Sequence, residues 1–500
     1  MAPDKFVMAI DVGTTSVKSL LMDVKGEVRA SSSQGYPTYS PRKSWVEQKP
    51  LEWWEAVVAA VGELLKKVNP SQIEAVSLSG HMSAPVLIDE SGQPVYPSIL
   101  ISDTRSTAQT NYLRERFLER FTALTGNEPL DAFTVSKLLW FKEENPSVLS
   151  KTAHLVFPKD FVRYQLTGRV GTDPTDAGNS LLYHDVADNW NWDLIKELQL
   201  PAHIFPEITK PTEVFGFITD DVSRLTGLNA GTPVITGAAD MACSQIGTGA
   251  TLKGTLAITL STSGQVVMRV PSHHEGGIGK VTFHPGVPRD SMYAMGTVFT
   301  GGLGVDWVYR LLHENKEKDQ QLAELTEKMK EIRPGSNGLL FLPFLVGSGT
   351  PHFDPKDRAS WLGLSLSQDK ALLLHSVLEG ISFNILENVE VFQDMGLEVE
   401  RVHIGAGGSK NPVWCRMIAN MLGQNVHTLK NRDGSGMGAA ILAGVGIDVF
   451  PSIESAVKKV VDVDEVISFD LEKYRKYEGL YGRYKEMYKA INRYYRTVIG

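Results

Sequence analysis

A hydroxyl-rich turn near the N-terminus has the residue types of a phosphate cradle. Asp11 ends an apolar run, Gly13 permits a tight turn, and four donor residues follow: Thr14, Thr15, Ser16 and Lys18. Hydroxyl groups and turn amides suit phosphate oxygens, and an anion beside them is most simply explained by a divalent cation between the two. On local grounds alone, an ordinary hairpin with a Thr-rich turn is the alternative.

A single acid, Asp240, follows the apolar run 232–239. Proteins of the α/β class place reactive groups at the carboxyl ends of strands, so this carboxylate could do chemistry. An Asp in this position is also typical of a helix N-cap, and both interpretations stay open.

Two later turns could contribute to the same kind of site. Residues 256–268 repeat the plan of strand, polar turn and strand, with Thr262 and Ser263 in the turn. Residues 401–422 predict a strand, a Gly-rich turn and a helix, where Gly407 and Gly408 would let a flat base or ribose approach the backbone. A plain strand-to-helix turn is the alternative. Neither common nucleotide loop is present: residues 405–410 lack the Walker spacing, and residues 434–438 miss the third glycine of the dinucleotide fingerprint by one position.

The elements around these residues alternate in the manner of an α/β protein. Strands are expected at 6–10, 17–22 and 73–79, and a helix that begins at Pro50 has an apolar stripe at helical spacing. That stripe comprises Trp53, Ala56, Val57, Ala60, Val61 and Leu64. A second core begins near residue 232, which indicates a duplicated architecture. We expect an N-terminal domain at 1–250, a C-terminal domain at 251–500 and a ligand cleft between the two halves.

Composition narrows the class of protein. The formal net charge of −8 over 500 residues argues against non-specific binding to nucleic acid or anionic membranes. The N-terminal run lacks a basic segment and is interrupted by charges, so we expect no signal peptide or membrane span, and a cytoplasmic location. Cys243 and Cys415 stand far apart, which predicts free thiols rather than a disulfide or zinc site.

The C-terminal segment predicts a helix with an aromatic face. Its tyrosines recur at spacings of three and four: Tyr474, Tyr477, Tyr481, Tyr484, Tyr488 and Tyr495. We expect this face to pack in the core or in an interface rather than to hold a cofactor. A second copy of the chain, in a homodimer, is a separate expectation for a partner.

In their order along the chain, these features resemble the FGGY carbohydrate kinases, the family of xylulokinase, gluconokinase and glycerol kinase. The resemblance runs nearly end to end, and its segments are 11–18, 45–48, 103–105, 137–140, 240, 261–264, 341–355, 363–381 and 405–411. It implies the actin-like ATPase (ribonuclease H-like) fold, an α/β architecture of two duplicated domains that close on ATP and Mg²⁺.

The resemblance also implies roles. Asp240 would be the general base that takes the proton from a sugar hydroxyl, and with Asp11 it would lie at the magnesium. The residues implied for ATP are Gly13, Thr14, Thr15, Ser16, Lys18, Thr262, Ser263, Gly302, Gly407, Gly408 and Asn411. Those implied for a small carbohydrate are His81, Met82, Ser83, Asp103, Arg105 and Asp240.

The presumed sugar pocket departs from the xylulokinase pattern at three places. Met82 is flanked by His81 and Ser83 where Gln-Met-His is common, and Ile101 stands where Trp is usual. Ala239 precedes the acid where Gly is common, and Met241 follows it where Asn or Gln is common. Because a hydrogen-bonding site discriminates strongly, these changes should alter the accepted substrate. His81 and Ser83 could restore donors from shifted positions.

We therefore expect an ATP-dependent carbohydrate kinase with a ketopentose such as xylulose as the leading acceptor. A gluconate or polyol kinase is the alternative within the family. From another class, an actin- or Hsp70-like nucleotide switch would lack a base aimed at a sugar hydroxyl, and a kinase-like chain without catalysis is a third alternative.

Overall fold

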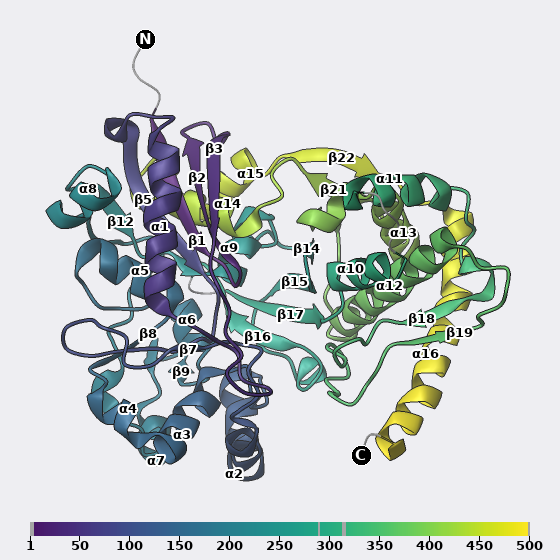
Figure 1. Ribbon diagram of the computed structural model, residues 1–500, viewed down its shortest axis with the longest axis horizontal. Coiled ribbons are helices and arrows are strands. Elements are labelled where there is room, and N and C mark those ends of the chain that lie inside the picture. Colours follow the sequence, from purple (N-terminus) through teal and green to yellow (C-terminus); the bar gives the residue numbers. More distant parts are fainter. Residues whose placement is uncertain (1–4, 289–290, 313–316, 499–500) are drawn as a thin grey trace. The chain divides into compact units, whose positions relative to one another are not determined.

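A computed structural model of the protein describes residues 5–288, 291–312 and 317–498. The chain forms two compact units (Figure 1). The first unit comprises 1–251, 283–293 and 433–461, and the second comprises 252–282, 294–432 and 462–500. The single boundary expected after residue 250 did not anticipate that two later segments fold with the first unit.

The first unit is built on a mixed sheet with the strand order β11-β12-β5-β1-β2-β3, and β13 also pairs with β5. Its strands are β1 (Phe6–Val12), β2 (Ser16–Asp23), β3 (Val28–Gly35), β5 (Ile73–Gly80), β11 (Val214–Phe217), β12 (Pro233–Ile235) and β13 (Ala238–Ala239). The hairpin of β1 and β2 is antiparallel, as its sequence predicts, whereas β1 and β5 are parallel. The predicted strand at 232–239 is divided between β12 and β13.

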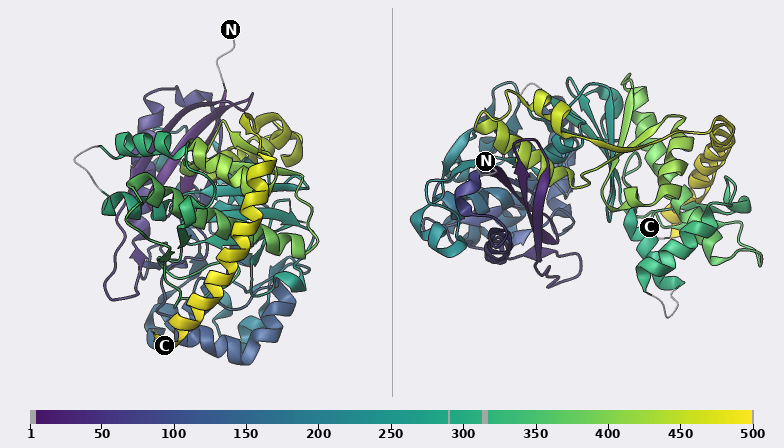
Figure 2. Two further views of the ribbon diagram at one scale, coloured as in Figure 1. Left: turned by 90° about the vertical axis from the view of Figure 1, so that its right-hand side faces the viewer. Right: turned by 90° about the horizontal axis from the view of Figure 1, so that it is seen from above.

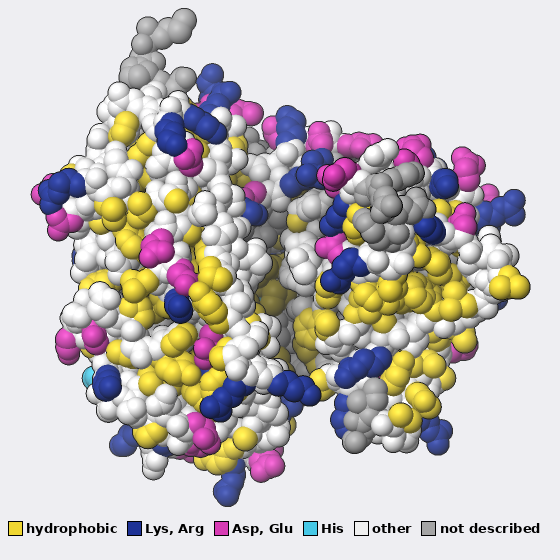
Figure 3. Space-filling view, in the orientation of Figure 1, with side chains coloured by type: hydrophobic (Ala, Val, Ile, Leu, Met, Phe, Trp, Pro, Cys, Tyr) yellow, Lys and Arg dark blue, Asp and Glu magenta, His cyan; other side chains and the backbone are white. Residues whose placement is uncertain are grey.

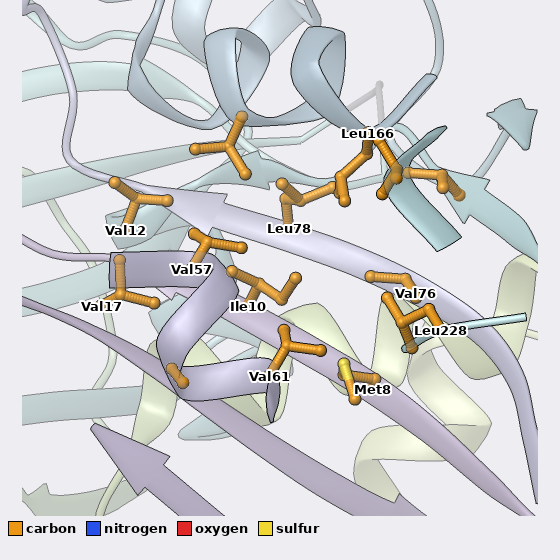
Figure 4. Close-up of a cluster of buried hydrophobic side chains, with 14 of the residues drawn as sticks. Met8, Ile10, Val12, Val17, Val57, Val61, Val76, Leu78, Leu166 and Leu228 are labelled. Atoms are coloured by element: carbon orange, nitrogen blue, oxygen red, sulfur yellow. The ribbon is translucent and has the colours of Figure 1, made fainter. Parts of the chain in front are cut away.

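Helices cover both faces of this sheet. Helix α1 (Pro50–Leu65) buries all six residues of the predicted stripe, which confirms it. These side chains pack on Val17, Leu21 and other apolar residues in one core cluster (Figure 4). Helix α14 (Gly434–Gly446) covers the opposite face, where Gly436 lies against Leu20. The sheet is therefore apolar on both sides, as expected for strands between two helical layers.

The remaining helices of the first unit lie mostly after β5. They are α2 (Thr107–Thr125), α3 (Thr134–Glu144), α4 (Pro146–Lys151), α5 (Pro158–Thr167), α6 (Pro174–Gly178), α7 (Trp192–Glu197), α8 (Asp220–Thr226), α9 (Asp240–Gly247) and α15 (Ile453–Val460). A second buried cluster joins α2, α3 and the segment that follows them, through Phe121, Leu138 and Leu155. The short strands here are β4 (Glu47–Gln48), β6 (Val86–Ile88), β7 (Ser98–Ile99), β8 (His154–Val156), β9 (Tyr183–His184) and β10 (Asn189–Trp190).

A second mixed sheet repeats the plan with the strand order β16-β17-β15-β14-β20-β21-β22. Most of β16 and the first two residues of β17 lie in the segment 283–293 of the first unit, and the other strands belong to the second unit. The strands are β14 (Thr255–Leu260), β15 (Gly264–Val270), β16 (Thr282–Pro285), β17 (Met292–Val298), β20 (Arg401–Gly405), β21 (Val426–Leu429) and β22 (Val463–Ile467). A small hairpin pairs β18 (Leu340–Leu342) with β19 (Ser360–Leu362). The helices are α10 (Gly302–Leu311), α11 (Lys318–Met329), α12 (Lys370–Asp394), α13 (Pro412–Leu422) and α16 (Leu471–Val498).

The aromatic face of α16 packs within the second unit. Figure 2 shows this helix along its whole length, and it contacts α13 and α12. Tyr477, Tyr481 and Tyr484 are buried, and their hydroxyl groups donate to Glu379, Glu390 and Glu387 of α12. Rings that are buried while their hydroxyl groups bond to acids confirm the core alternative for this stripe.

Candidate active site

Three chemically capable side chains lie at the carboxyl ends of neighbouring strands of the first unit. Strand register places Asp11 of β1 beside Ser79 of β5, and Ala239 of β13 beside Gly80. The next residues after Gly80 and Ala239 are His81, whose amide donates to the Val12 carbonyl (2.9 Å), and Asp240. Three of the predicted site residues, Asp11, His81 and Asp240, therefore come from adjacent strand ends.

Asp240 is the first residue of α9 and does not cap it. The N-cap position belongs to Ala239, and one Asp240 carboxylate oxygen accepts from the neighbouring Met241 amide (2.7 Å). Burial, followed by the negative charge of Asp11, raises the pKa of Asp240 from 3.8 to about 8. A carboxyl group with this pKa exchanges a proton near neutral pH, which is the range that acid–base catalysis requires.

Asp11 carries an unsatisfied buried oxygen. Its Oδ2 accepts from the Ser435 hydroxyl (3.0 Å), whereas its Oδ1 is buried with no hydrogen-bond partner among the described residues. Burial and the charge of Asp433 raise the pKa of Asp11 to about 6. A buried carboxylate oxygen without a donor, close to other acids, fits the ligand set of a divalent cation such as Mg²⁺.

Ser435 and Asp433 were missed by sequence reasoning. Both stand at the start of α14, about 420 residues after Asp11, and a Cβ added at Gly438 of this helix would lie 1.9 Å from the Cys243 carbonyl of α9. Glycine therefore allows α14 and α9 to pack in direct backbone contact, which brings Asp433 and Ser435 to Asp11. The usable sequence signal was the polar, Gly-rich run 433–436, which fits a tight turn at the start of a helix.

The predicted phosphate turn is tight, and its two threonine side chains face solvent. The Gly13 amide donates to the Ser16 carbonyl (3.1 Å), and the Thr14 and Thr15 side chains are exposed. The Tyr36 hydroxyl donates to the Gly13 carbonyl, a contact that the sequence did not indicate. The Lys18 ammonium nitrogen lies 3.9 Å from a carboxylate oxygen of Asp433, the residue that caps α14. The ammonium group therefore faces the acids around Asp11.

The loop that follows β5 combines a buried histidine with a constrained serine. His81 is 2% exposed, and neither ring nitrogen has a hydrogen-bond partner among the described residues. Burial lowers its pKa to about 3, so the imidazole is neutral at physiological pH. Ser83 adopts a φ of 63°, and its carbonyl accepts from Lys137 Nζ (2.9 Å).

Asn179 joins this loop to a distant strand. It follows α6, its amide donates to the Met82 sulfur (3.5 Å), and its carbonyl accepts from the Ser83 hydroxyl (3.2 Å). Its Oδ1 lies 2.6 Å from Nδ1 of His284. His284 is a buried residue of β16, and its ring stacks on Tyr293.

Asp103 and Arg105 were predicted to bind substrate, but they bond to each other and to their neighbours. The Arg105 guanidinium donates to both Asp103 carboxylate oxygens and to Glu47, and lies 3.7 Å from the centre of the Trp45 ring. Asp103 also accepts from the Val46 amide (2.5 Å). The Arg105 side chain is only 1% exposed, so these contacts hold the pair in place, and its role in substrate binding stays a prediction.

A buried ionic cluster beneath the strand ends was also missed. The ammonium group of Lys159 lies 2.5 Å from Asp160, 2.5 Å from Asp173 and 2.8 Å from Asp176. Because the Lys159 ammonium is within bonding distance of all three carboxylates, we assign an ion cluster rather than a metal site. Thr175, which donates to Asp173, accepts from the Ala239 amide (2.8 Å), so the cluster supports the residue before Asp240.

The second unit brings several predicted nucleotide residues together. The amides of Gly302 and Leu303 donate to the Ser261 and Thr262 carbonyls (2.6 and 2.9 Å), so the start of α10 lies on the tip of the β14–β15 hairpin. A Cβ at Gly408 would lie 2.5 Å from Leu260, at the same tip, whereas Gly407 faces open space. Thr262, Ser263, Gly302, Gly407 and Gly408 are therefore neighbours.

Asn411 has a structural task in the same unit. Its Oδ1 accepts from the Val413 and Trp414 amides (3.0 and 3.1 Å), so Asn411 is the N-cap of α13. An Asn at this position satisfies helix donors that would otherwise lack partners. The Asn411 carbonyl accepts from the Cys415 amide (3.1 Å), so the Gly-rich turn before it is the part left for a ligand.

Charged side chains of both signs are exposed on the surface, and the two cysteines are buried. Lys and Arg are interspersed with Asp and Glu on the face of each unit in Figure 3, and hydrophobic side chains gather around α10 and β18–β19. Cys243 and Cys415 are free and buried, as predicted. Among the described residues, none of the helices has the length and apolar character that a bilayer crossing requires.

Comparison with known proteins identifies the family. Residues 6–247 match the model of the FGGY family of carbohydrate kinases, N-terminal domain, and residues 256–447 match that of the C-terminal domain. A xylulose kinase of Bacillus subtilis is 34% identical over 486 residues, which cover 97% of each chain. A gluconokinase of the same organism is 26% identical over 463 residues, 90% of each chain.

A solved structure shows the same architecture. A xylulose kinase from Rhodospirillum rubrum superposes with a TM-score of 0.89 at 26% identity, over 98% of this chain and 100% of that one. The two mixed sheets with their helices thus form the actin-like ATPase fold of sugar kinases, and the chain is a carbohydrate kinase. Because both family models match, and together they cover most of the chain, the protein belongs to the FGGY family of carbohydrate kinases.

Proposed function

We propose that the protein transfers the γ-phosphoryl group of ATP to a hydroxyl group of a small carbohydrate, with a ketopentose such as xylulose as the leading acceptor. Similarity to a xylulose kinase along almost the whole chain supports this acceptor. Sugar kinases of this family use ATP, usually with Mg²⁺. The observation that carries the proposal is Asp240, an acid at a strand end with a pKa near neutrality and no capping task.

Asp240 would act as the general base. It accepts the proton of the acceptor hydroxyl as that oxygen attacks the γ-phosphorus, and the carboxylate must lie within hydrogen-bond reach of the hydroxyl. The nearby charge of Asp11 raises its pKa, so a cation bound at Asp11 would favour the ionised, basic form of Asp240.

The chain's own donors and acids would hold the nucleotide. Asp11 and Asp240 would hold Mg²⁺, which when bound balances the negative charge of the transferring phosphoryl group. Thr14, Thr15 and Lys18 would contact phosphate oxygens, and Gly13 would keep the turn tight. In the second unit, the hairpin tip with Thr262 and Ser263 would meet the phosphates, and the glycine turns at 302 and 407–408 would receive adenosine.

A gluconate or polyol kinase is the second candidate within the family. A gluconokinase is among the similar proteins, and the loop at His81 and Ser83 and the apolar Ile101 depart from the expected pattern for xylulose. The neutral, buried His81, whose two ring nitrogens have no partner among the described residues, could bond either a hydroxyl or a carboxylate-bearing acceptor.

A coupled ADP-release assay would test the proposal. Pentuloses, hexuloses, aldonates and polyols are each offered with Mg-ATP, and Asp240→Asn protein serves as the blank. We expect one acceptor class to stimulate ADP release, and Asp240→Asn to lower that rate by roughly 10²–10⁴-fold while ATP binding persists. A flat response across the panel would favour the nucleotide switch or a kinase-like chain without catalysis.

A further inference from the structure

Tyr293 places a hydroxyl group in the buried interior of the protein. The residue, on β17, is 0% exposed, and its hydroxyl oxygen has no hydrogen-bond partner among the described residues. Buried hydroxyl groups are almost always paired, because leaving one unpaired costs free energy. The hydroxyl therefore carries an energetic cost unless it donates to a bound molecule.

The ring of Tyr293 is held in place by a chain of contacts. It stacks on His284 with 5.1 Å between ring centres and 23° between planes. Because Oδ1 of Asn179 can only accept, His284 donates to it from Nδ1 over 2.6 Å. Asn179 in turn bonds Met82 and Ser83, the loop that begins with His81. Tyr293 is thus linked to the loop beside Asp240, the proposed general base.

The electrostatic surroundings of Tyr293 point to the same place. Burial is the first cause of its strongly raised pKa, and the largest charge effect comes from Asp240, ahead of Asp176 and Asp173. The phenol is therefore neutral and keeps its proton as a hydrogen-bond donor. Its hydroxyl lies within electrostatic range of the acid that we propose as the base.

We propose that Tyr293 is a specificity-determining residue, whose hydroxyl donates a hydrogen bond to an oxygen of the carbohydrate acceptor bound at Asp240. The inference rests on the proposed function and extends it to a residue of β17. The recognised atom is a hydroxyl or carbonyl oxygen of the acceptor other than the one phosphorylated. Losing such a bond should lower kcat/KM about 10- to 100-fold, mainly through the acceptor KM.

Tyr293→Phe provides the test, with Tyr183→Phe as the matched control. Tyr183 is also a buried tyrosine of the first unit, but its hydroxyl donates to Asp188 (2.5 Å). We expect Tyr293→Phe to be at least as heat-stable as the wild type without acceptor, and to raise the acceptor KM while the ATP KM is unchanged. Tyr183→Phe should lower heat stability and leave the acceptor KM unchanged.

Acceptor analogues that each lack one oxygen sharpen the test. The wild type should discriminate against the analogue that lacks the recognised oxygen, and Tyr293→Phe should not. An unchanged acceptor KM, or a loss of heat stability in the acceptor-free Tyr293→Phe protein, overturns this inference alone. A wild type that releases no ADP with any carbohydrate overturns the proposed function and this inference together.

Discussion

Replacing Asp240 by Asn should remove phosphoryl transfer and stabilise the protein at the same time. Folding raises the Asp240 pKa from 3.8 to about 8, so the folded chain binds this proton more tightly than the unfolded chain. Between about pH 4 and pH 8 the unfolded form has released a proton that the folded form retains, and stability falls as the pH rises. The neutral Asn side chain escapes this loss.

The magnitude follows from the size of the shift. Roughly four pKa units at about 1.4 kcal/mol each give ~5 kcal/mol above pH 8, as an upper limit because Asp240 keeps some contact with solvent. At pH 7 the difference is roughly 4 kcal/mol, because it is still growing up to pH 8, and it vanishes below pH 4, where both forms are protonated. For a unit of this size, such a gain corresponds to a rise in Tm of roughly 10 °C.

Thermal unfolding of both proteins from pH 4 to pH 9 would measure this difference. Asp221→Asn is the matched control, because Asp221 is an acid of the same unit whose side chain is 89% exposed on α8. The control should track the wild type at every pH. An Asp240→Asn protein that is no more stable than the wild type at pH 8, or a gain that does not shrink toward pH 4, would refute the reasoning.

Three further outcomes follow from the site. Asp11→Asn should raise the Mg²⁺ concentration needed for half-maximal activity. It should also move the rising limb of the residual pH–rate profile to lower pH, because the Asp11 charge raises the Asp240 pKa. A rising limb that stays in place would contradict this coupling. Ser83→Ala should raise the acceptor KM without changing the ATP KM, and kinetics equal to wild type would remove Ser83 from the pocket. Lys159→Met should cost about 3–5 kcal/mol in urea unfolding, because it leaves buried carboxylates uncompensated, and a cost under 1 kcal/mol would refute the cluster.

Local sequence patterns predicted the elements that depend on residues close together in the chain. The apolar stripe of α1 appeared at helical spacing and is buried as expected. The N-terminal hairpin was predictable because apolar runs flank a polar turn with Gly13. Asp240 stood out because a single acid interrupts small, apolar residues at the end of a strand.

Long-range pairings could not be predicted in this way. The approach of Ser435 to Asp11 depends on helix α14 packing on α9 through Gly438, and no local pattern encodes that contact. The burial of His284 was equally hidden, because its strand is short and its stacking partner, Tyr293, lies on another strand. The buried Lys159 had one usable signal, a charged pair inside the apolar run 155–162.

Transfer of labelled phosphate tests the central claim most directly. The protein is incubated with γ-labelled ATP, Mg²⁺ and xylulose or the best acceptor of the panel, and the products are separated. We predict that label enters a sugar phosphate with the wild type and not with Asp240→Asn, although both proteins bind ATP. Label found only in free phosphate, or equal sugar labelling by the two proteins, would contradict the assignment of Asp240 as the base of a carbohydrate kinase.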